Sequence, residues 1–284
     1  MVNDGYCSLG IAPLPSYGRG REQPGGRYMS FLHGDGLHDV IITGENGTID
    51  GQGLVWWNMW RQRTLRFTRP NLIELMNSRS IIISNVIFKN SPFWNIHPVY
   101  CSHVVIQYVT ILAPADSPNT DGIDPAIGSE TSGGVQDVLA EHINLFNMGV
   151  GIHLKTNIGR GGVIRNITVS NVYMENAGKG IKISGDVGDH PDEYYNHNAI
   201  PVIKNIVIKD VWEERVEQPG LIRGLRNASF TEICLSNINL RGAIGQRNLP
   251  WQCSDVSGVV VQVSPWSCSQ LTSGRHIGAC SSSF

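Results

Sequence analysis

The sequence lacks the features that are typical of membrane proteins and of nucleic-acid-binding proteins. It has no run of about 18 apolar residues, the length that a transmembrane helix needs. Charged residues make up only 16% of the chain and the net charge is −2, so no polycationic surface for nucleic acid is expected. We therefore expect neither a membrane nor a nucleic acid as a partner.

Metal-binding patterns and export signals are also missing. No Cys-x-x-Cys spacing indicates a zinc site, and we expect neither a metal nor a cofactor. The N-terminal stretch MVNDGYCSLG has no basic region followed by an apolar core, so no signal peptide is visible. The cellular location of the protein must therefore be inferred from other features.

The cysteines and the Asn-x-Ser/Thr triplets bear on that location. The sequence has six cysteines, which permit disulfide bonds, and among the last three we favour a bond between Cys253 and Cys268. Triplets that can accept an N-linked sugar begin at Asn46, Asn166 and Asn227. These triplets favour a secreted protein.

The composition suits a β protein that is rich in turns. The chain has 32 glycines and few charged residues, a combination that is less common in helical proteins. Its 284 residues suffice for one large β domain. We expect a single β-helix domain over 1–284, with an extended lead-in over 1–36, coils over 37–265 and a C-terminal tail over 266–284. The arginines of the lead-in, Arg27 among them, are expected to be solvated or to grip an anionic polymer.

A pattern of two short strands joined at one polar residue recurs through most of the chain. Repetition of this kind is typical of solenoids, in which stacked units bury an apolar face that one unit cannot bury alone. The copies lie at 80–90, 103–113, 137–147, 166–176, 205–215 and 232–242, and their joining residues are Asn85, Tyr108, His142, Asn171, Asp210 and Asn237.

This pattern predicts an all-β fold, a right-handed parallel β-helix. Inward-facing Ile, Val and Leu would fill the lumen, and Asn side chains stacked at the bends would hydrogen-bond along the axis. No copy shows a helical period, which disfavours the helical solenoids. A β-sandwich also consists of short strands and turns, and it remains the structural alternative.

One polar stretch, SPNTDGID at 117–124, interrupts the runs of Val and Ile. It is good turn chemistry, because Asn and Asp cap their own backbone and Gly tolerates positive φ. It is also where a rigid scaffold would present a site, since functional residues gather on loops. From the residues alone, both interpretations stay open.

Further stretches cover nearly the whole chain and carry a family resemblance. They read LPSYGRGREQPGGRY, TGENGTIDGQG, NSPFWNIHPVYC, LAPADSPNTDGIDP, IGSETSGG, LKTNIGRGGVIRNITVSNV and KISGDVGDHPDE. Together they resemble glycoside hydrolase family 28, the polygalacturonase-type pectinases, and in particular its plant branch. The resemblance implies a right-handed parallel β-helix that hydrolyses α-1,4-galacturonosyl bonds in pectin without a metal. It implies pectin or polygalacturonate as the partner and a location in the cell wall, and we expect a monomer.

The resemblance also implies roles for individual residues. Asp121 matches a catalytic carboxylate in the Asn-Thr-Asp motif, and Asn119 lies beside it in the site. Asp124 follows three residues later and is a second candidate carboxylate. Lys155 matches the lysine of an Arg-Ile-Lys motif that binds the substrate carboxylate, and His153 stands where the motif has arginine.

Two candidates for substrate binding differ from the motif or lie beyond it. His153 is mostly neutral at pH 7 and lacks the planar fork of arginine, but it would gain charge in an acidic cell wall. Arg160, in Gly-Arg-Gly-Gly, could make a second contact to an anion, and a loop-stabilising role is the alternative.

An internal block of the family is missing from the sequence. In the family an Asp-Asp pair supplies the general acid and a second water-binding carboxylate, and this chain has no Asp-Asp pair or Gly-His-Gly motif. Pro125 is followed almost at once by the Ile-Gly-Ser-Glu segment at 127–130. Loss of whole coils would let the solenoid restack, whereas loss of a partial coil would leave unpaired strand edges.

Three functions remain as hypotheses. The first is an inverting, two-carboxylate pectin hydrolase. Its turnover would be weak or absent, because the chain lacks the Asp-Asp pair that supplies the general acid, and a general acid contributes about 10²–10⁴ in rate. The second is a non-catalytic pectin-binding protein that keeps a groove for the polymer along the stacked repeats. The third, a calcium-dependent pectate lyase, shares the β-helix, but the acidic stretch at 117–124 is too small to hold Ca²⁺.

Overall fold

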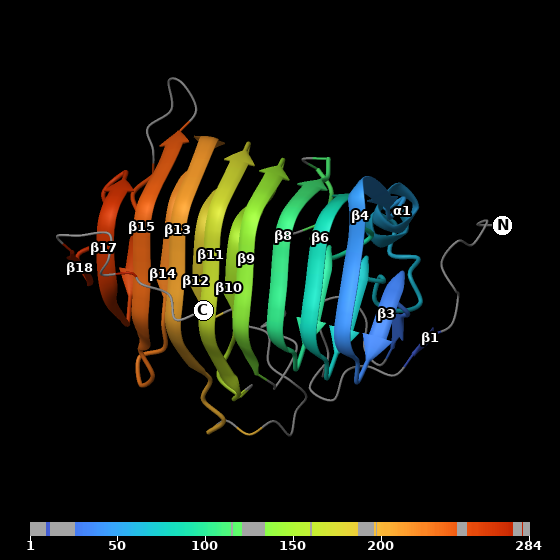
Figure 1. Ribbon diagram of the computed structural model, residues 1–284, viewed down its shortest axis with the longest axis horizontal. Coiled ribbons are helices and arrows are strands. Elements are labelled where there is room, and N and C mark those ends of the chain that lie inside the picture. Colours follow the sequence, from blue (N-terminus) through green and yellow to red (C-terminus); the bar gives the residue numbers. More distant parts are fainter. Residues whose placement is uncertain are drawn as a thin grey trace.

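The structure is a computed structural model that describes residues 10–11, 26–114, 116–120, 134–159, 161–186, 196, 198–242, 249–274 and 280. It is a right-handed parallel β-helix, as the sequence predicts. The strands lie side by side along the long axis, with α1 (Leu54–Arg61) beside β4 near the N-terminal end and β18 at the other end (Figure 1). The β-sandwich alternative is wrong, because the strands of the three larger sheets pair in parallel.

Nine strands form one parallel sheet, called the long sheet below. Each strand pairs with the strand of the next coil, so neighbours in the sheet are also neighbours along the chain. The strands are β4 (His38–Asp50), β6 (Arg79–Lys89), β8 (Ser102–Leu112), β9 (Val135–Phe146), β11 (Val163–Glu175), β13 (Val202–Val216), β15 (Phe230–Gly242), β17 (Val256–Ser264) and β18 (Leu271–Ser273).

Two shorter parallel sheets and one antiparallel pair complete the described strands. The shorter sheets bring further strands of the same coils together, and they carry the candidate site. The paired strands run past both ends of the range 37–265 that the sequence predicts for the coils. The three-stranded sheet is β3 (Leu32–Asp35), β5 (Ile73–Met76) and β7 (Ile96–Val99); the four-stranded sheet is β10 (Val150–Lys155), β12 (Lys179–Ser184), β14 (Gln218–Arg223) and β16 (Gln252–Ser254); the antiparallel pair is β1 (Gly10–Ile11) and β2 (Arg27–Tyr28).

Aliphatic side chains fill the lumen, because alternate residues of each strand face inward. Ile83 of β6 pairs in register with Ile106 of β8, and both are fully buried. The same alternation buries Ile152 and Leu154 of β10 against the core. Burial of each such side chain stabilises the fold by about 1.5–3 kcal/mol, so the stacked aliphatic rows are the main source of stability.

The polar joining residues of the repeat bend the strands of the long sheet. All six have left-handed backbone conformation, with φ between 49° and 54°, a region that Asn and Asp enter more readily than other non-glycine residues. Asn237 Nδ2 donates to Asp210 Oδ1 at 2.6 Å across neighbouring coils. A similar row runs near the strand starts, where Asn166 Nδ2 donates to Asp137 Oδ1 at 2.7 Å. The predicted hydrogen bonding along the axis at the bends is therefore confirmed for Asn237 and Asp210, whereas the row through Asn166 lies outside the predicted bends.

The coils restack without a break in the long sheet where the internal block is missing. β8 and β9 flank this junction and pair in parallel from Ser102↔Gln136 to Leu112↔Phe146, with no shift of register. Both strands bury their inward side chains as the other coils do. On this sheet the junction therefore has the form expected for the loss of whole coils, not of a partial one.

Two disulfides close the C-terminal part of the chain. Cys253 bonds Cys268, as the sequence predicts, and Cys234 of β15 bonds Cys280. Within the described residues, no helix has the length and apolar character to span a membrane.

Candidate active site

The residues predicted to form the site fall on two parts of the structure. Asn119 is exposed and has φ 55° at the end of the segment 116–120. His153 and Lys155 lie on β10 of the four-stranded sheet. Asp121, Asp124 and Arg160 lie outside the described residues.

A buried arginine holds the segment 116–120 against the neighbouring coil. Arg69 Nη1 donates to the carbonyl oxygens of Pro92 at 2.8 Å and Pro118 at 2.9 Å. Arg69 Nη2 donates to Asn119 Oδ1 at 2.9 Å. Hydrogen bonds from a charged donor stabilise by about 1.5–3 kcal/mol each, so this one side chain fixes the backbone that leads to Asp121.

Aromatic rings hold the guanidinium of Arg69 in turn. Its carbon Cζ lies 5.2 Å from the ring centroid of Trp60 and 4.8 Å from that of Phe93. Such contacts are attractive and strengthen when the cation is desolvated. The sequence gives little sign of this role, because nothing local to Arg69 reveals partners that come from the next coils.

Further hydrogen bonds, within the segment 116–120 and from Asn95 just before β7, also hold the segment in place. Ser117 Oγ donates to the carbonyl oxygen of Pro114 at 2.6 Å and lies 2.5 Å from Thr120 Oγ1. Asn95 Nδ2 donates to the Thr120 carbonyl oxygen at 3.4 Å. The segment is thus a hydrogen-bonded turn, as one interpretation of the sequence holds, and it is also rigidly positioned, as a site would require.

His153 and Lys155 project from the face of β10 that lies opposite the lumen. Their neighbours Ile152 and Leu154 belong to the core, so the alternation of the strand sends the two basic residues outward. They are nevertheless only 6% and 7% exposed, and both ring nitrogens of His153 are shielded from solvent. A polymer carboxylate would reach His153 only if the residues that cover it moved.

Lys155 lies over an aromatic ring that comes from an earlier coil. Its Nζ is 4.4 Å from the ring centroid of Trp94, just before β7. Trp94 in turn stacks on Phe93, with centroids 4.2 Å apart. Lys155 follows the junction in the chain, and this contact places its charge beside the stacked rings of Trp94 and Phe93, the second of which also contacts Arg69.

Two further cations lie on the following rungs, and sequence reasoning missed them. Lys182 of β12 pairs in register with His153, and Arg223 of β14 pairs with Ser184, which pairs with Lys155. Arg223 Nη1 donates to Asp186 Oδ2 at 2.7 Å. The signal was present as a repeat, because Gly-Ile-His-Leu-Lys at 151–155 aligns with Gly-Ile-Lys-Ile-Ser at 180–184.

An ionic cluster occupies the corresponding face of the three-stranded sheet. The buried Glu74 forms an ion pair with Arg27, and it accepts hydrogen bonds from His33 Nδ1 and His97 Nδ1, each at 3.1 Å. Asn71 Nδ2 contacts the same carboxylate at 3.3 Å. Arg27 is buried, so the prediction that it is solvated is wrong, because Glu74 lies beside it in the next coil.

The cluster keeps Glu74 ionised. Burial would raise the pKa of Glu74, but the hydrogen bonds from His33 and His97, together with the charges of His97 and Arg27, hold that pKa well below its usual value. The Nδ1 of His97 is therefore bound to Glu74, and His97 has a structural role that links β7 to β5. Among the described residues, no group of three or more His, Cys, Asp and Glu side chains could hold a metal ion.

Comparisons with known proteins agree with this architecture. The profile of "Glycosyl hydrolases family 28" matches residues 21–130 and 126–268. A "Probable polygalacturonase" of Vitis vinifera is 40% identical over 316 aligned positions, covering 92% of this chain and 64% of the relative. The alignment is longer than the chain of 284 residues, so the relative has residues with no counterpart here. The two profile matches meet at 126–130, where the sequence predicts the missing block.

Solved structures share the fold at low sequence identity. A polygalacturonase from Erwinia carotovora ssp. carotovora superposes with a TM-score of 0.61 at 19% identity, covering 95% of this chain and 75% of that one. An exopolygalacturonase from Thermotoga maritima gives a TM-score of 0.51 at 21% identity, covering 83% and 72%. The chain spans slightly less than two thirds of the Vitis vinifera relative's length. With both halves of the family profile matched, the chain belongs to glycosyl hydrolases family 28.

Proposed function

We propose that this chain binds polygalacturonate, the backbone of pectin, and hydrolyses its α-1,4-galacturonosyl bonds at a strongly reduced rate. The observation that carries the substrate class is the series of cations Lys155, Lys182 and Arg223 on three successive strands of one sheet face. Neighbouring strands lie roughly 4.8 Å apart. One cation for each strand suits a polymer that carries one carboxylate for each sugar.

The proposed chemistry is that of an inverting glycosidase. A carboxylic acid protonates the glycosidic oxygen, a carboxylate takes a proton from water, and that water attacks the anomeric carbon from the opposite face. Asp121 is our candidate for one carboxylate and Asp124 for the second. Asn119, fixed through Oδ1 by Arg69, would turn its amide nitrogen to the sugar, and Arg160 would add an anion contact.

The reduced rate follows from the missing Asp-Asp pair. The chain has no such pair, so the family's general acid has no counterpart at its usual place. A positioned general acid contributes about 10²–10⁴ in rate. Binding without turnover is the second candidate function, and the continuous pairing of β8 with β9 supports it, because the coils on the two sides of the junction stay stacked on the long sheet without the lost coils.

We further propose that the protein is a monomer that is secreted and works in the cell wall. The disulfides Cys234–Cys280 and Cys253–Cys268 support this location, since such bonds persist in oxidising compartments.

The test of hydrolysis is the release of reducing ends from polygalacturonic acid at mildly acidic pH, with Asp121→Asn measured in parallel. We expect slow release by the wild-type chain and none by the variant. Release that is unchanged in Asp121→Asn would refute the role of Asp121. No release from a folded wild-type chain would refute hydrolysis and favour the binding function.

Binding is tested separately by retention on immobilised polygalacturonate. Lys155→Met should weaken retention, and Lys89→Met is the matched control, because Lys89 is exposed at the end of β6 on the long sheet. Added salt should weaken wild-type retention, since it screens charge. Equal retention of the two variants would contradict the proposed cation row.

A further inference from the structure

Two residues break the pattern of the bends in the long sheet. Asn85, Asn171 and Asn237 occupy this position in other coils, and Asn adopts the left-handed conformation with little strain. Tyr108 and His142 adopt it too, with φ 53° and 54°, and for tyrosine this conformation is uncommon. Because the fold accepts Asn at this position, the stacking of coils does not explain why two rings stand there.

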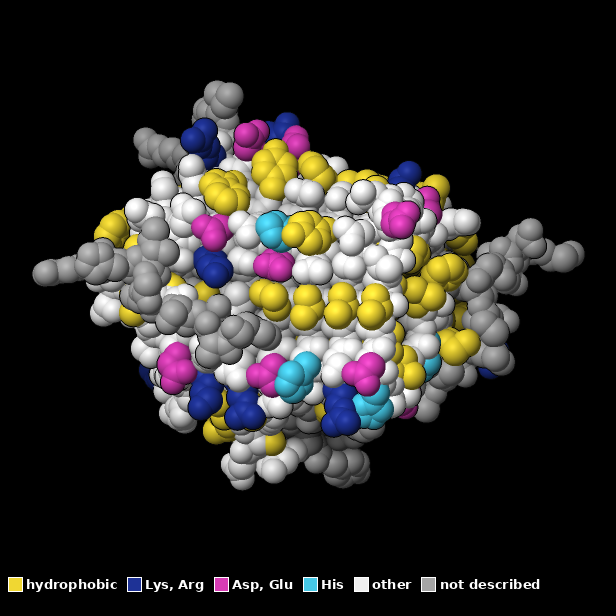
Figure 2. Space-filling view, viewed as in Figure 1, with side chains coloured by type: hydrophobic (Ala, Val, Ile, Leu, Met, Phe, Trp, Pro, Cys, Tyr) yellow, Lys and Arg dark blue, Asp and Glu magenta, His cyan; other side chains and the backbone are white. Residues whose placement is uncertain are grey.

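The two rings form one flat surface on the outside of the sheet. Tyr108 and His142 stack in parallel, with centroids 4.5 Å apart and 6° between their planes. Tyr108 is 51% exposed. This face of the molecule lies away from the lumen, and Figure 2 shows a row of hydrophobic side chains across it.

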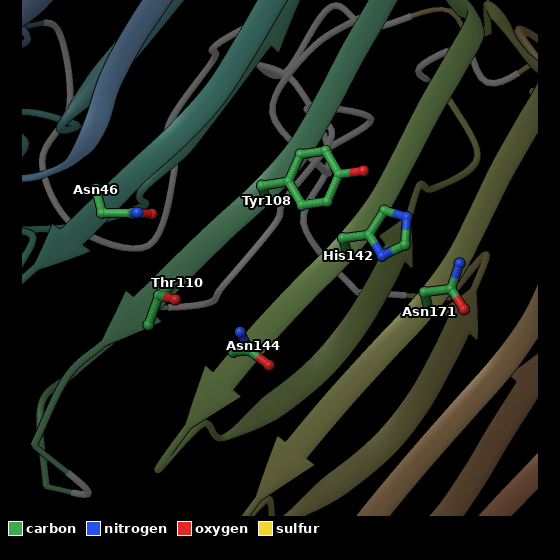
Figure 3. A pocket seen from close by; sticks show the side chains of 6 residues that line it. All are labelled: Asn46, Tyr108, Thr110, His142, Asn144 and Asn171. Carbon is green, nitrogen blue, oxygen red and sulfur yellow. The ribbon is translucent and has the colours of Figure 1, made fainter.

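Amide and hydroxyl groups surround the stacked rings. Together they line a shallow hollow of about 330 Å³, and its lining among the described residues includes no lysine or arginine (Figure 3). A ring face is an apolar surface against which the C–H side of a sugar can pack, and amides both donate to and accept from sugar hydroxyls. The lining therefore suits an uncharged sugar, in contrast to the cationic face of the four-stranded sheet. The hollow is lined by Asn46, Tyr108, Thr110, His142, Asn144 and Asn171.

One of the lining residues begins an Asn-x-Ser/Thr triplet. Asn46 is followed by Gly47 and Thr48 and is exposed on β4. The register of β4 against β6 shifts between Thr43 and Gly47, so the chain bulges at Asn46. In Figure 3 the Asn46 amide projects towards the side of the hollow on which Tyr108 lies.

We propose that Asn46 carries an N-linked glycan whose core sugars lie on the stacked rings of Tyr108 and His142. In the transfer, Asn46 Nδ2 forms a bond to C1 of the first N-acetylglucosamine and gives up one proton. The bond from C1 to the diphosphate of the lipid carrier breaks, and the lipid diphosphate leaves with the electron pair. Two strand spacings, roughly 10 Å, separate β4 from β8, so the core sugars and not the linking amide reach Tyr108.

The other two triplets provide an internal comparison. Asn166 Nδ2 donates to Asp137 Oδ1 at 2.7 Å, and Asn166 Oδ1 accepts from Asn205 Nδ2 at 2.8 Å. A sugar on Asn166 would break this row, so Asn166 stays unmodified in the folded protein. Asn227 is exposed on a turn and has no place in the hollow, so a glycan there would extend into solvent.

The test uses the full chain secreted from plant cells behind an added secretion signal. Peptide mapping should find a glycan at Asn46 and none at Asn166. A peptide N-glycosidase acting on the native protein should release the Asn46 glycan roughly tenfold more slowly than one at Asn227, as expected for a sugar held by a stacking contact. The inference rests on the proposed secretion, and the added signal separates a failure of secretion from a failure of the site.

The decisive variant is Tyr108→Asp with His142→Asn. Asp and Asn stand at the same bend in other coils, at Asp210 and Asn237, so this variant should fold. It should remove the protection of the Asn46 glycan and leave release at Asn227 unchanged. Trp212→Ser is the control, because Trp212 is an exposed aromatic residue of β13 outside the hollow.

Several results would overturn the proposal. These are an unmodified Asn46 beside a modified Asn227, equal release at both positions, or a glycan on Asn166 in the folded protein. Retention of the wild-type chain on a neutral polysaccharide that the Tyr108→Asp, His142→Asn variant loses, with unchanged glycan release, would assign the hollow to a separate sugar chain instead.

Discussion

The three-stranded sheet and the lumen beneath β13 each bury one glutamate, and their surroundings leave one carboxyl group charged and the other neutral. Glu74 of β5 points away from the lumen and meets Arg27 and His97 from the coils on either side. Glu213 of β13 pairs in register with Met174 and Leu240, both of which belong to the core. The difference lies in which face of the strand each glutamate occupies.

The two pKa values are displaced in opposite directions. Burial raises the pKa of Glu213 to about 8, and the single hydrogen bond from the Ala177 N–H, at 3.1 Å, only partly offsets this. Burial acts on Glu74 as well, but bonded histidines and Arg27 outweigh it. A β-helix can therefore bury a carboxylate on its outward face, where adjacent coils supply cations, but it protonates one placed in the lumen.

The largest expected effect comes from Glu74→Gln. This substitution removes the only anion of the Arg27–Glu74 ion pair and leaves a buried arginine beside a neutral amide. Breaking a buried ion pair on one side costs about 3–5 kcal/mol. Denaturant unfolding at pH 7 should show a loss of this size, and a loss below about 1 kcal/mol would contradict the charged state of Glu74.

The control for that measurement is the double variant Arg27→Met, Glu74→Met. Replacing both members of a buried ion pair by apolar residues is often close to neutral. The double variant should therefore be more stable than Glu74→Gln alone.

The sequence predicts the repeat and its bends far better than it predicts these glutamates. Alternation and the polar joining residues are local, so they can be read within one coil. Glu74 instead depends on residues 47, 41 and 23 positions away, and no local pattern reveals which of them lies on the next rung. For the same reason the sequence wrongly predicts a solvated Arg27, which is buried.

Glu213→Gln should change stability in the opposite direction, and the change should depend on pH. Below pH 4.5 both folded and unfolded chains hold the proton on Glu213. Above this value the unfolded chain releases it while the folded chain retains it, so wild-type stability falls as pH rises until the folded pKa of about 8.

The amide of Glu213→Gln keeps an acceptor for the Ala177 N–H and cannot titrate. The stability of the variant relative to wild type should therefore increase with pH by up to about 1.4 kcal/mol per unit within this window. Unfolding measured at pH 5, 6, 7 and 8 checks the slope, and a difference that is constant with pH would show that Glu213 is ionised in the folded chain.

The candidate site is predictable in part for similar reasons. The outward projection of His153 and Lys155 follows from alternation with Ile152 and Leu154. Their burial does not follow from alternation, because it depends on other coils. Arg69 shows the same limit, since its bonds reach across 23, 49 and 50 residues.

Within the Glu74 cluster, His97→Gln should cost more than any other single histidine replacement. The His97 side chain is 1% exposed, so water cannot replace the hydrogen bond to Glu74 when the substitution removes or weakens it. A hydrogen bond to a charged group contributes about 1.5–3 kcal/mol, and the loss should approach that range. Thermal and denaturant unfolding at pH 6 and 7 would measure it, and a loss smaller than that of His33→Gln would contradict this assignment.

The smallest expected effect is that of His33→Gln, and it tests whether burial sets the strength of these bonds. His33 and His97 both bond Glu74 through Nδ1 at 3.1 Å, so the two contacts match in geometry and in acceptor. The side chain of His33 is 24% exposed, however, and water can occupy the place that the imidazole leaves. We expect a loss of about 1 kcal/mol or less, because solvent screens a partly exposed charge interaction. Equal losses for the two variants would mean that the number of bonds to Glu74, and not their burial, keeps its charge in place.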